Sequence, residues 1–380
     1  MWKVPLSDVD LGQNEIKAVT NVIKSKWLTM GEITQKFEKA FAEYLGVKHA
    51  FAVSSGTAAL HLAHEVLELD AGDEVICPSF TFVATANSIL YSGGAPIFAD
   101  IKSLDDLNIS PSNISEKISR RTKAITIVHY GGYPCDMDEI TEIAEEHNLH
   151  VIEDAAHAPG AEYKGKKCGA IGDIGCFSFF PNKNMTTGEG GMIVTNNDEF
   201  ARKIKLLRSH GMTALTLDRY KGHAFSYDVV DLGYNYRMDE IGSSIGLVQL
   251  RKLNANNERR RHIVKRYVKE LSRIPEIGIP FRSFHEASSC HIFPILLKNP
   301  DQRTGFMEEL KKCGIQASIH YPPIHLFRFY RDKFGYKEGM LPITEDAGRR
   351  EVTLPLYSTM KKKDVGYVIK NVKKSIEKLR

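Results

Sequence analysis

The chain has 380 residues, of which 42% are hydrophobic and 26% are charged. This composition is ordinary for a water-soluble globular protein, and the length suits one large domain with a smaller one. The formal net charge of +4 gives no reason to expect a nucleic-acid partner, although it suits an anionic, phosphorylated substrate.

No apolar run approaches the roughly 20 residues that a membrane-spanning helix needs, and the N-terminus lacks the apolar core of a signal peptide. We therefore expect a cytoplasmic protein with no membrane partner. The six cysteines are scattered and form no C-x-x-C pair, which favours reduced, mostly buried thiols over a zinc site or a disulfide framework.

Two amphipathic helices are predicted first, at residues 14–24 and 33–45. From residue 50 onward, short apolar runs alternate with helical stretches. The predicted strands are residues 50–53, 74–77, 96–99, 124–128, 150–153, 174–179 and 192–194, and the predicted helices between them are 57–69, 81–91 and 136–147. The strand runs do not alternate polar with apolar residues, which fits burial on both faces of a mostly parallel sheet in an α/β protein.

The C-terminal third has a different pattern. Residues 238–273 predict a long charged helix that crosses between domains, with a break near residues 253–257. A strand at 291–297, a helix at 301–313, a strand at 315–320 and a closing helix at 361–379 follow it. These elements predict a smaller α+β unit, so we place a large domain at residues 1–250 and a small one at 251–380. The lysine run at 361–363 is interpreted as a solvated helix face.

The stretch from residue 151 to 197 carries the strongest chemical signal. Asp154 ends an apolar run, and in open α/β sheets the carboxyl ends of strands face the ligand crevice. Lys183 follows a second apolar run and precedes the glycine-rich turn at residues 188–191. An apolar setting lowers the pKa of a lysine, which gives the neutral amine that forms a Schiff base with an aldehyde. A lysine together with a carboxylate that keeps a ring nitrogen protonated is what pyridoxal phosphate (PLP) chemistry needs.

Several weaker signals surround this pair, and each has a bland alternative. Residues 54–59 (S-S-G-T-A-A) open a helix after a strand, which predicts a phosphate site or only an N-cap by Ser55. Phe82 is either a stacking face for a flat cofactor or a core residue. His157 lies on the same side as Asp154 if the chain turns helically there, but a lone histidine is often structural. Asn235 is either a phosphate donor or a helix cap.

The motifs together resemble the DegT/DnrJ/EryC1/StrS family of PLP-dependent nucleotide-sugar aminotransferases. The resemblance rests on W-L-T near the N-terminus, S-S-G-T-A-A-L, P-S-F-T-F-V-A-T, G-x-P-x-D-M, E-D-A-A-H-A, S-F-F-P-N-K-N-M-T-T-G-E-G-G, G-Y-N-Y-R-M and H-Y-P-P-I-H. It spans nearly the whole chain. It implies the type I aminotransferase fold, with a large domain built on a mostly parallel central sheet and a smaller C-terminal α+β domain.

The resemblance also implies roles for individual positions at the cofactor. Lys183 would bind PLP covalently and shuttle a proton, and Asp154 would pair with the pyridine nitrogen. His157 would lie near the ring and Phe82 would stack on it. Four further positions would hold the cofactor phosphate: Gly56, Thr57, Ser178 and, from the neighbouring subunit, Asn235. A homodimer with shared active sites is therefore implied.

Substrate positions follow less directly from the same resemblance. Thr29, Tyr321 and His325 would line the sugar side of the site. The amino donor would be an amino acid, glutamate being the expected one, and the acceptor a nucleotide-linked keto-sugar used for polysaccharide or amino-sugar biosynthesis. The form of residues 27–31 favours relatives that act at C4 over those that act at C3. Tyr133 stands where many relatives carry glutamine, which leaves the role of that position open.

Other functions remain as alternatives. A PLP-dependent sugar dehydratase of the same fold would carry histidine in place of Lys183, so the lysine argues against it. Amino-acid transamination would need a well-placed arginine that the sequence does not identify. A regulatory protein that kept the fold would not need an intact Lys183 and Asp154. A nicotinamide dehydrogenase is disfavoured because no G-x-G-x-x-G follows a strand.

Overall fold

The computed structural model describes residues 2–214, 220–222, 226–283 and 287–379. Its centre is a seven-stranded sheet with the order β1-β9-β8-β5-β4-β2-β3. The strands are β1 (His49–Val53), β2 (Glu74–Pro78), β3 (Ala95–Ala99), β4 (Thr122–Val128), β5 (His150–Asp154), β8 (Ile174–Ser178) and β9 (Gly191–Thr195). The pairs from β8 to β3 are parallel, whereas β9 runs antiparallel to both β1 and β8. The predicted mostly parallel sheet is confirmed.

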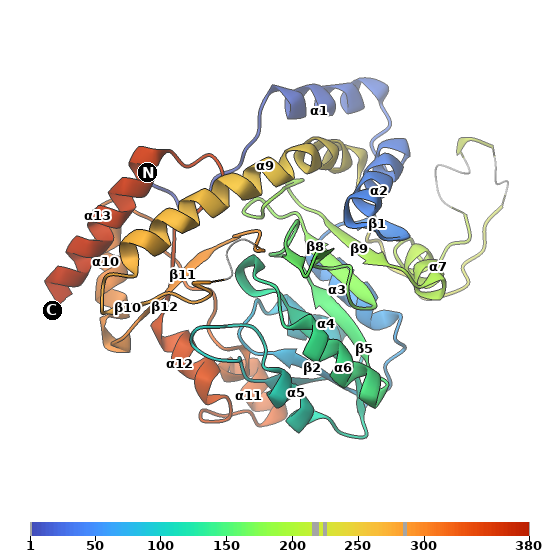
Figure 1. Ribbon diagram of the computed structural model, residues 1–380. Helices are drawn as coiled ribbons and strands as arrows, with labels where there is room; N and C mark the ends of the chain where they lie inside the picture. Colours follow the sequence, from blue (N-terminus) through green and yellow to red (C-terminus); the bar gives the residue numbers. More distant parts are fainter. Residues whose placement is uncertain (1, 215–219, 223–225, 284–286, 380) are drawn as a thin grey trace.

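Helices cover both faces of this sheet (Figure 1). One face packs against α3 (Gly56–Glu65), α4 (Ala84–Tyr91), α7 (Asp198–Leu207) and α11 (Arg328–Phe334). The other face packs against α2 (Glu32–Leu45), α5 (Pro111–Lys117), α6 (Met137–His147) and the long α9 (Glu240–Leu271). The strands are accordingly buried on both sides, with every residue of β2 and β9 buried. This double burial is the reason that their sequences read as continuous apolar runs.

The helix α9 is continuous over 32 residues, so the break predicted near residues 253–257 is wrong. Asp239 caps its first turn by accepting a hydrogen bond from the backbone N–H of Gly242 at 2.7 Å. The polar residues that suggested a break are buried and bonded to other elements. Asn256 donates to a carboxylate oxygen of Asp10, and Asn257 donates to the carbonyl oxygen of Pro159. These polar side chains bond to residues outside the helix, and the helix continues through them.

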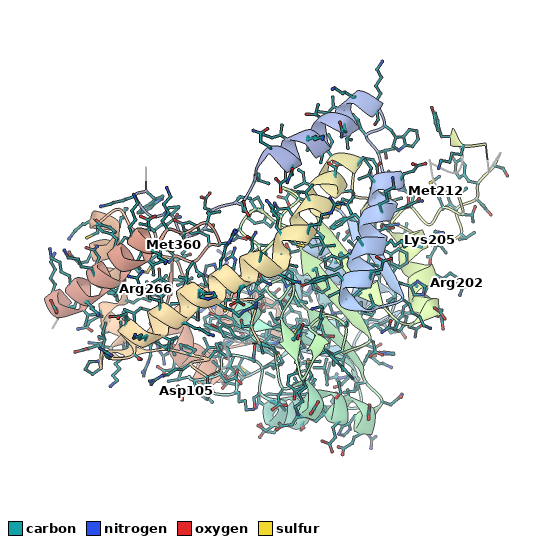
Figure 2. All side chains as sticks on the ribbon, turned by 45° about the horizontal axis from the view of Figure 1, so that its top comes forward. Asp105, Arg202, Lys205, Met212, Arg266 and Met360 are labelled. Carbon is teal, nitrogen blue, oxygen red and sulfur yellow. The ribbon has the colours of Figure 1, made fainter. Side chains whose placement is uncertain are left out.

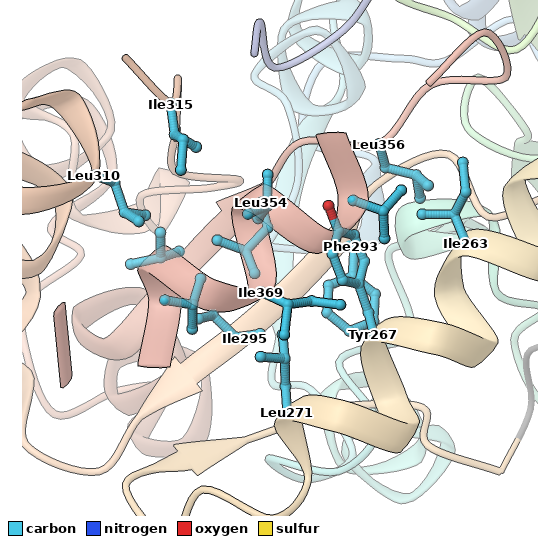
Figure 3. Close-up of a cluster of buried hydrophobic side chains, with 14 of the residues drawn as sticks. Ile263, Tyr267, Leu271, Phe293, Ile295, Leu310, Ile315, Leu354, Leu356 and Ile369 are labelled. Atoms are coloured by element: carbon cyan, nitrogen blue, oxygen red, sulfur yellow. The ribbon is translucent and has the colours of Figure 1, made fainter. Parts of the chain in front are cut away.

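The C-terminal unit has its own core around a three-stranded antiparallel sheet (Figure 3). Its strands are β10 (Ile277–Gly278), β11 (Phe293–Leu297) and β12 (Glu351–Leu354), and its helices are α10 (Arg303–Lys312), α12 (Pro342–Arg350) and α13 (Lys362–Leu379). The C-terminal half of α9 packs into the same core through Ile263, Tyr267 and Leu271. The expected boundary at residue 250 stays a prediction, because α9 crosses it without interruption.

The N-terminal residues belong to this C-terminal core. Val4 is fully buried there and forms a parallel bridge with Ile315. The helix α1 (Gln13–Ser25) then runs along α9 and is followed by α2. The chain therefore enters the large sheet on the side that lies away from the C-terminal unit (Figure 1). Figure 2 shows the two ends of the molecule, with Arg202 and Lys205 on α7 at one end and Arg266 near Met360 at the other.

The strand predicted at residues 315–320 is wrong. Ile315 bridges Val4, whereas Ser318 bridges Thr353 of β12, so two single-residue bridges to different partners replace a ladder. A short hairpin of β6 (Glu162–Tyr163) and β7 (Lys166–Lys167) completes the described strands. Within the described ranges, no helix is both long enough and apolar enough to cross a membrane, and no group of three acidic, histidine or cysteine side chains is arranged to hold a metal ion.

Candidate active site

A cavity of about 360 Å³ opens at the carboxyl ends of the central strands. Parallel strands place their carboxyl ends at one edge of the sheet, which is where ligands bind in open α/β folds. Eight of the predicted positions form part of its wall: Gly56, Thr57, Phe82, Asp154, His157, Ser178, Lys183 and Tyr321. Segments that are far apart in the sequence therefore meet in one concave site.

Asp154 is the last residue of β5 and is only 5% exposed. Its Oδ2 accepts a hydrogen bond from the hydroxyl of Thr85 at 2.8 Å, and its Oδ1 accepts one from the backbone N–H of Ala156 at 3.1 Å. Burial raises the pKa of this carboxyl, while the two hydrogen bonds and the nearby Lys183 oppose that rise. A buried, ionised carboxylate is stabilised by a cationic partner, and a protonated ring nitrogen would be such a partner.

Lys183 lies in the loop between β8 and β9, where its backbone N–H donates to the carbonyl oxygen of Phe180. Burial lowers the pKa of its ammonium to about 8, and attraction to Asp154 partly offsets this effect. The lysine is therefore partly neutral near physiological pH. A neutral amine is a nucleophile toward aldehydes and can also accept a proton.

The glycine-rich turn after Lys183 has a geometric cause. Gly188 has φ of +86° and Gly190 has φ of +151°, a range in which side chains are strained. A Cβ atom on Gly191 would lie 2.5 Å from the carbonyl oxygen of Ser55. The turn therefore brings β9 against the segment that opens α3, which is the phosphate end of the predicted site.

The start of α3 shows both features that the sequence left open. The hydroxyl of Ser55 accepts a hydrogen bond from the N–H of Ala58 at 3.0 Å, so the N-cap is real. Gly56 and Thr57 nevertheless line the cavity, and a Cβ atom on Gly56 would lie 2.7 Å from Cβ of Ser178. Glycine is required for that close approach. The positive end of a helix, with small residues beside it, suits a phosphate group.

Phe82 and His157 form the aromatic part of the wall. Phe82 is 55% exposed, so its alternative interpretation as a core residue is excluded, and its ring faces that of Tyr321 at 6.2 Å between centroids. His157 is 3% exposed, and its Nε2 lies 3.0 Å from the hydroxyl oxygen of Tyr321. Burial, with the nearby charge of Lys183, holds the pKa of His157 well below its ordinary range. Its ring is neutral at physiological pH.

Three predicted positions lie outside the cavity wall. Thr29 and Asn235 are exposed, and the backbone of Asn235 bridges that of Ser209. His325 is fully buried away from the cavity, with Nδ1 2.8 Å from the Ser79 hydroxyl and Nε2 3.1 Å from Glu345. Within this chain His325 therefore has a packing role, and its expected contact with the sugar stays a prediction.

Tyr133, the position that departs from many relatives, also lies away from the cavity. It is 2% exposed, and its ring stacks on that of Phe281 with centroids 4.2 Å apart and an interplanar angle of 6°. Burial holds the pKa of its hydroxyl well above the ordinary value. The side chain therefore packs the interior of the protein and does not form part of the cavity wall.

Sequence reasoning missed residues that complete the site. Thr85 holds Asp154, and His320 and Asn182 form part of the cavity wall. The loop of Lys183 is anchored by Asn184, which donates to Ser289 at 2.7 Å and accepts from His291 at 3.0 Å. Thr85 and His320 stand inside the motifs P-S-F-T-F-V-A-T and H-Y-P-P-I-H. Their position next to recognised residues was the available signal.

Comparison with known proteins agrees with this geometry. Residues 9–373 match the sequence model of the DegT/DnrJ/EryC1/StrS aminotransferase family. The spore coat polysaccharide biosynthesis protein SpsC of Bacillus subtilis is 40% identical over 375 residues, which are 97% of this chain and 96% of that protein. The structure of PseC from Helicobacter pylori, an aminotransferase involved in the biosynthesis of pseudoaminic acid, matches with a TM-score of 0.93 at 34% identity over 99% of both chains.

A second solved relative bears on the cofactor. The putative sugar aminotransferase Spr1654 from Streptococcus pneumoniae has a TM-score of 0.93 at 30% identity in its PMP-form, covering 100% of both chains, and 0.92 in its PLP-form. The cavity of this chain fits the same group, because it combines a buried carboxylate, a lysine of lowered pKa and a glycine-lined helix start. The chain belongs to the DegT/DnrJ/EryC1/StrS aminotransferase family and is a PLP-dependent sugar aminotransferase of the type I aminotransferase fold.

Proposed function

We propose that the enzyme transfers the amino group of glutamate to the 4-keto group of a nucleotide-linked sugar. The observation that carries this proposal is the pair of Asp154 and Lys183 at one cavity, with the lysine pKa lowered to about 8. That pair suits amino transfer and argues against dehydration, for which a histidine would replace the lysine. The sugar substrate is supported by the likeness to PseC, and a polysaccharide pathway by the likeness to SpsC.

The side chains then have distinct tasks. Bound PLP supplies the electron sink that lets an amine and a ketone exchange their groups. Lys183 would hold the cofactor through its Nζ, and its partly neutral amine could also accept and return a proton there. Asp154 would keep the ring nitrogen protonated, and Thr85 and the N–H of Ala156 orient its two oxygens. Phe82 contributes an aromatic face on which a flat ring can stack.

Different residues of the cavity wall would hold the phosphate and the sugar in this proposal. Gly56, Thr57 and Ser178 hold the phosphate beside the N-terminus of α3. Tyr321 contributes to the sugar side, where its hydroxyl already bonds to His157. Thr29 is proposed to reach the sugar side only in the assembled enzyme, because it is exposed in the single chain.

We further propose that the enzyme is a cytoplasmic homodimer with shared active sites. Asn235 is exposed and lies outside the cavity of its own chain, as a phosphate ligand for a partner must. Exposed apolar side chains precede it, at Val229 with 57%, Val230 with 56% and Leu232 with 84% exposure. Exposed apolar groups of this kind are typical of subunit contacts. No disulfide joins any of the six cysteines, all of which lie in the described part of the chain, and this suits a reducing compartment.

One experiment tests the proposed reaction directly. The purified enzyme is incubated with glutamate and a panel of 4-keto and 3-keto nucleotide sugars, and the products are identified by mass and NMR. We expect an amino sugar with nitrogen at C4. Nitrogen at C3 would overturn the positional assignment, and the absence of any amino sugar across the panel would overturn the sugar acceptor. The Lys183→Ala variant serves as the control for uncatalysed amination.

A further inference from the structure

His320 is a residue of the cavity wall that the tasks above do not use. Its Nδ1 lies 2.9 Å from Oγ1 of Thr353, and its backbone N–H donates to Oε2 of Glu351 at 2.7 Å. The hydroxyl of Tyr130 donates to its carbonyl oxygen. Among the residues that the structure describes, no group hydrogen-bonds to Nε2 of His320. These contacts thus hold the His320 ring at Nδ1 and at its backbone, and Nε2 is left for a ligand in the cavity.

A buried carboxyl group lies behind this histidine. Glu351 is fully buried in β12, and its Oε1 lies 2.5 Å from Oγ1 of Thr353. The groups therefore form an unbroken chain from the Glu351 carboxyl through the Thr353 hydroxyl to Nδ1 of His320. A hydroxyl donates one hydrogen and accepts others, so this chain has two complete arrangements that run in opposite directions.

The two arrangements differ in what His320 presents to the cavity. When Glu351 is ionised, Nδ1 of His320 donates to Thr353, Thr353 donates to Glu351, and Nε2 is a bare acceptor. When Glu351 is protonated, it donates to Thr353, Thr353 donates to Nδ1, and the hydrogen of the neutral ring stands on Nε2. A change of protonation at the buried carboxyl is therefore converted into a change of tautomer at the cavity wall.

The surroundings allow both arrangements near neutral pH. Burial raises the pKa of Glu351 to about 8, opposed by its hydrogen bonds to Thr353 and the His320 N–H and by the charge of Arg303. The Tyr130 and Tyr321 hydroxyls also face this carboxyl, and burial keeps the pKa of both well above the ordinary range, so both stay neutral.

The histidine itself resists becoming an imidazolium. Burial and the charge of Lys183 lower the pKa of His320 to about 4. Acting alone, His320 would be a weak base at physiological pH. Acting through Thr353, it can accept a proton at Nε2 while releasing one at Nδ1, so its ring never carries a charge. The basicity available at the cavity is then that of the buried carboxylate.

We propose that Glu351, Thr353 and His320 form a proton relay that deprotonates the ammonium group of the incoming amino donor. An N–H bond of the ammonium breaks and its proton binds Nε2 of His320. The Nδ1 hydrogen moves to Oγ1 of Thr353, and the Thr353 hydroxyl hydrogen moves to Oε1 of Glu351. The donor leaves this step as a neutral amine, and the positive charge of one proton has neutralised the Glu351 carboxylate. The same steps in reverse return the proton to a leaving amine.

The identity of this ammonium as that of glutamate rests on the proposed function, whereas the relay itself rests on the contacts. The first experiment therefore uses no substrate. Holoenzyme labelled with ¹⁵N-histidine is titrated from pH 6 to pH 10 (on the order of two units either side of the Glu351 midpoint), and the His320 signals are assigned with a His320→Gln variant. We expect the hydrogen to move from Nε2 to Nδ1 as pH rises through about 8.

A matched pair of variants shows whether Thr353 transmits the change. Thr353→Ser keeps the hydroxyl and should keep the tautomer exchange, whereas Thr353→Val removes the link and should abolish it. A single His320 tautomer across the whole range in the wild type would overturn the relay. So would an unchanged exchange in Thr353→Val.

The second experiment measures the donor half-reaction, as the rate at which glutamate removes the visible absorbance of the lysine-bound cofactor. We expect Thr353→Val to lower this rate by about 10²-fold, in the range of general acid–base effects, and Thr353→Ser to remain close to the wild type. An equal loss in both variants would show that Thr353 only supports the fold and would overturn the proposal. If glutamate fails with the wild type while the tautomer exchange is seen, the proposed donor is wrong and the relay stands.

Discussion

The hydroxyl of Thr85 donates to Oδ2 of Asp154 at 2.8 Å, although the two residues come from different layers of the fold. Thr85 stands in the first turn of α4, and Asp154 ends β5. Since burial raises the pKa of this carboxyl and the Thr85 hydrogen bond is the first effect that opposes the rise, a neutral side chain helps to keep Asp154 ionised. The negative charge of Asp154 thus depends in part on the uncharged Thr85.

Replacing Thr85 should therefore shift the pH profile. In Thr85→Val the pKa of Asp154 rises further, so its anionic form is lost at a higher pH as the solution is acidified. The acid limb of kcat/KM should move to higher pH, with the alkaline limb unchanged. Thr85→Ser, which keeps the hydroxyl, should retain the wild-type profile. An acid limb that does not move in Thr85→Val would show that the hydrogen bond does not control this carboxyl.

Removing the charge of Asp154 should separate cofactor binding from catalysis. Asp154→Asn keeps the size of the side chain and an oxygen that can accept from Thr85, but it cannot hold a ring nitrogen protonated. We expect the variant to bind PLP and to transaminate about 10²–10⁴-fold more slowly, the usual range when an acid–base partner is lost. Cofactor binding is followed by absorbance and turnover by amino-sugar formation. Full turnover in this variant would mean that another group pairs with the ring nitrogen.

Lys183 should react with the cofactor in a pH-dependent way. Its pKa is lowered to about 8, and only the neutral amine attacks the aldehyde, so the rate should rise as pH increases through that value and level off above it. The measurement is the growth of visible absorbance when PLP is added to apoenzyme between pH 6 and pH 10, a window of roughly two units on each side of the pKa. Lys183→Ala should show only the absorbance of the added PLP, with no growth of the lysine-bound band. A midpoint near the value of an exposed lysine would contradict the proposed burial effect.

The neighbouring Glu153 should matter for stability and not for the reaction. Its side chain is fully buried, with Oε1 accepting from Ile171 and Gly172 and Oε2 accepting from Gly169 and His129. Glu153→Gln would turn an amide group toward N–H donors, which leaves unpaired polar groups in the interior. We expect the free energy of unfolding to fall by about 3–5 kcal/mol, measured by urea denaturation. A loss below about 1 kcal/mol, the size of one ordinary hydrogen bond, would contradict this role.

Shared active sites predict complementation between two defective variants. A dimer that combines Lys183→Ala with Asn235→Ala has one site with both defects and one site with neither. Mixing the two variants under conditions of subunit exchange should therefore restore up to about a quarter of wild-type activity, since half of the dimers are mixed and each has one intact site. Each variant alone is the control. Mixed dimers without recovered activity would place Asn235 in the site of its own chain.

The central sheet was predictable because its physical cause is visible in the sequence. Strands buried on both faces leave continuous apolar runs, and those runs matched β2, β4, β5 and β9 to within two residues. The helix α7 was missed although Asn197 caps it by accepting from the N–H groups of Glu199 and Phe200. An asparagine in an N-cap position was the feature of the sequence from which α7 could have been predicted.

The site residues also fall into two groups, those that the sequence predicted and those that it missed. Asp154 and Lys183 were predictable because their chemistry depends on residue type and on position after an apolar run. Thr85 and His320 were not, because their roles depend on partners about 70 and 33 positions away along the chain, which only folding brings into contact. His325 also lies beside recognised residues, but its ring contacts Ser79 and Glu345, so its role at the sugar stays a prediction.

The position of Val4 in the C-terminal core has a consequence for how the protein is made. Val4 is synthesised long before its partner Ile315 and the packing residues of α13. The large sheet, whose strands end at Thr195, can assemble while the chain is still growing, because domains generally form in order of synthesis. The segment that carries Val4 must wait for Ile315 before it can pack. The bridge between Val4 and Ile315 can therefore form only after all the strands of the large sheet have been synthesised.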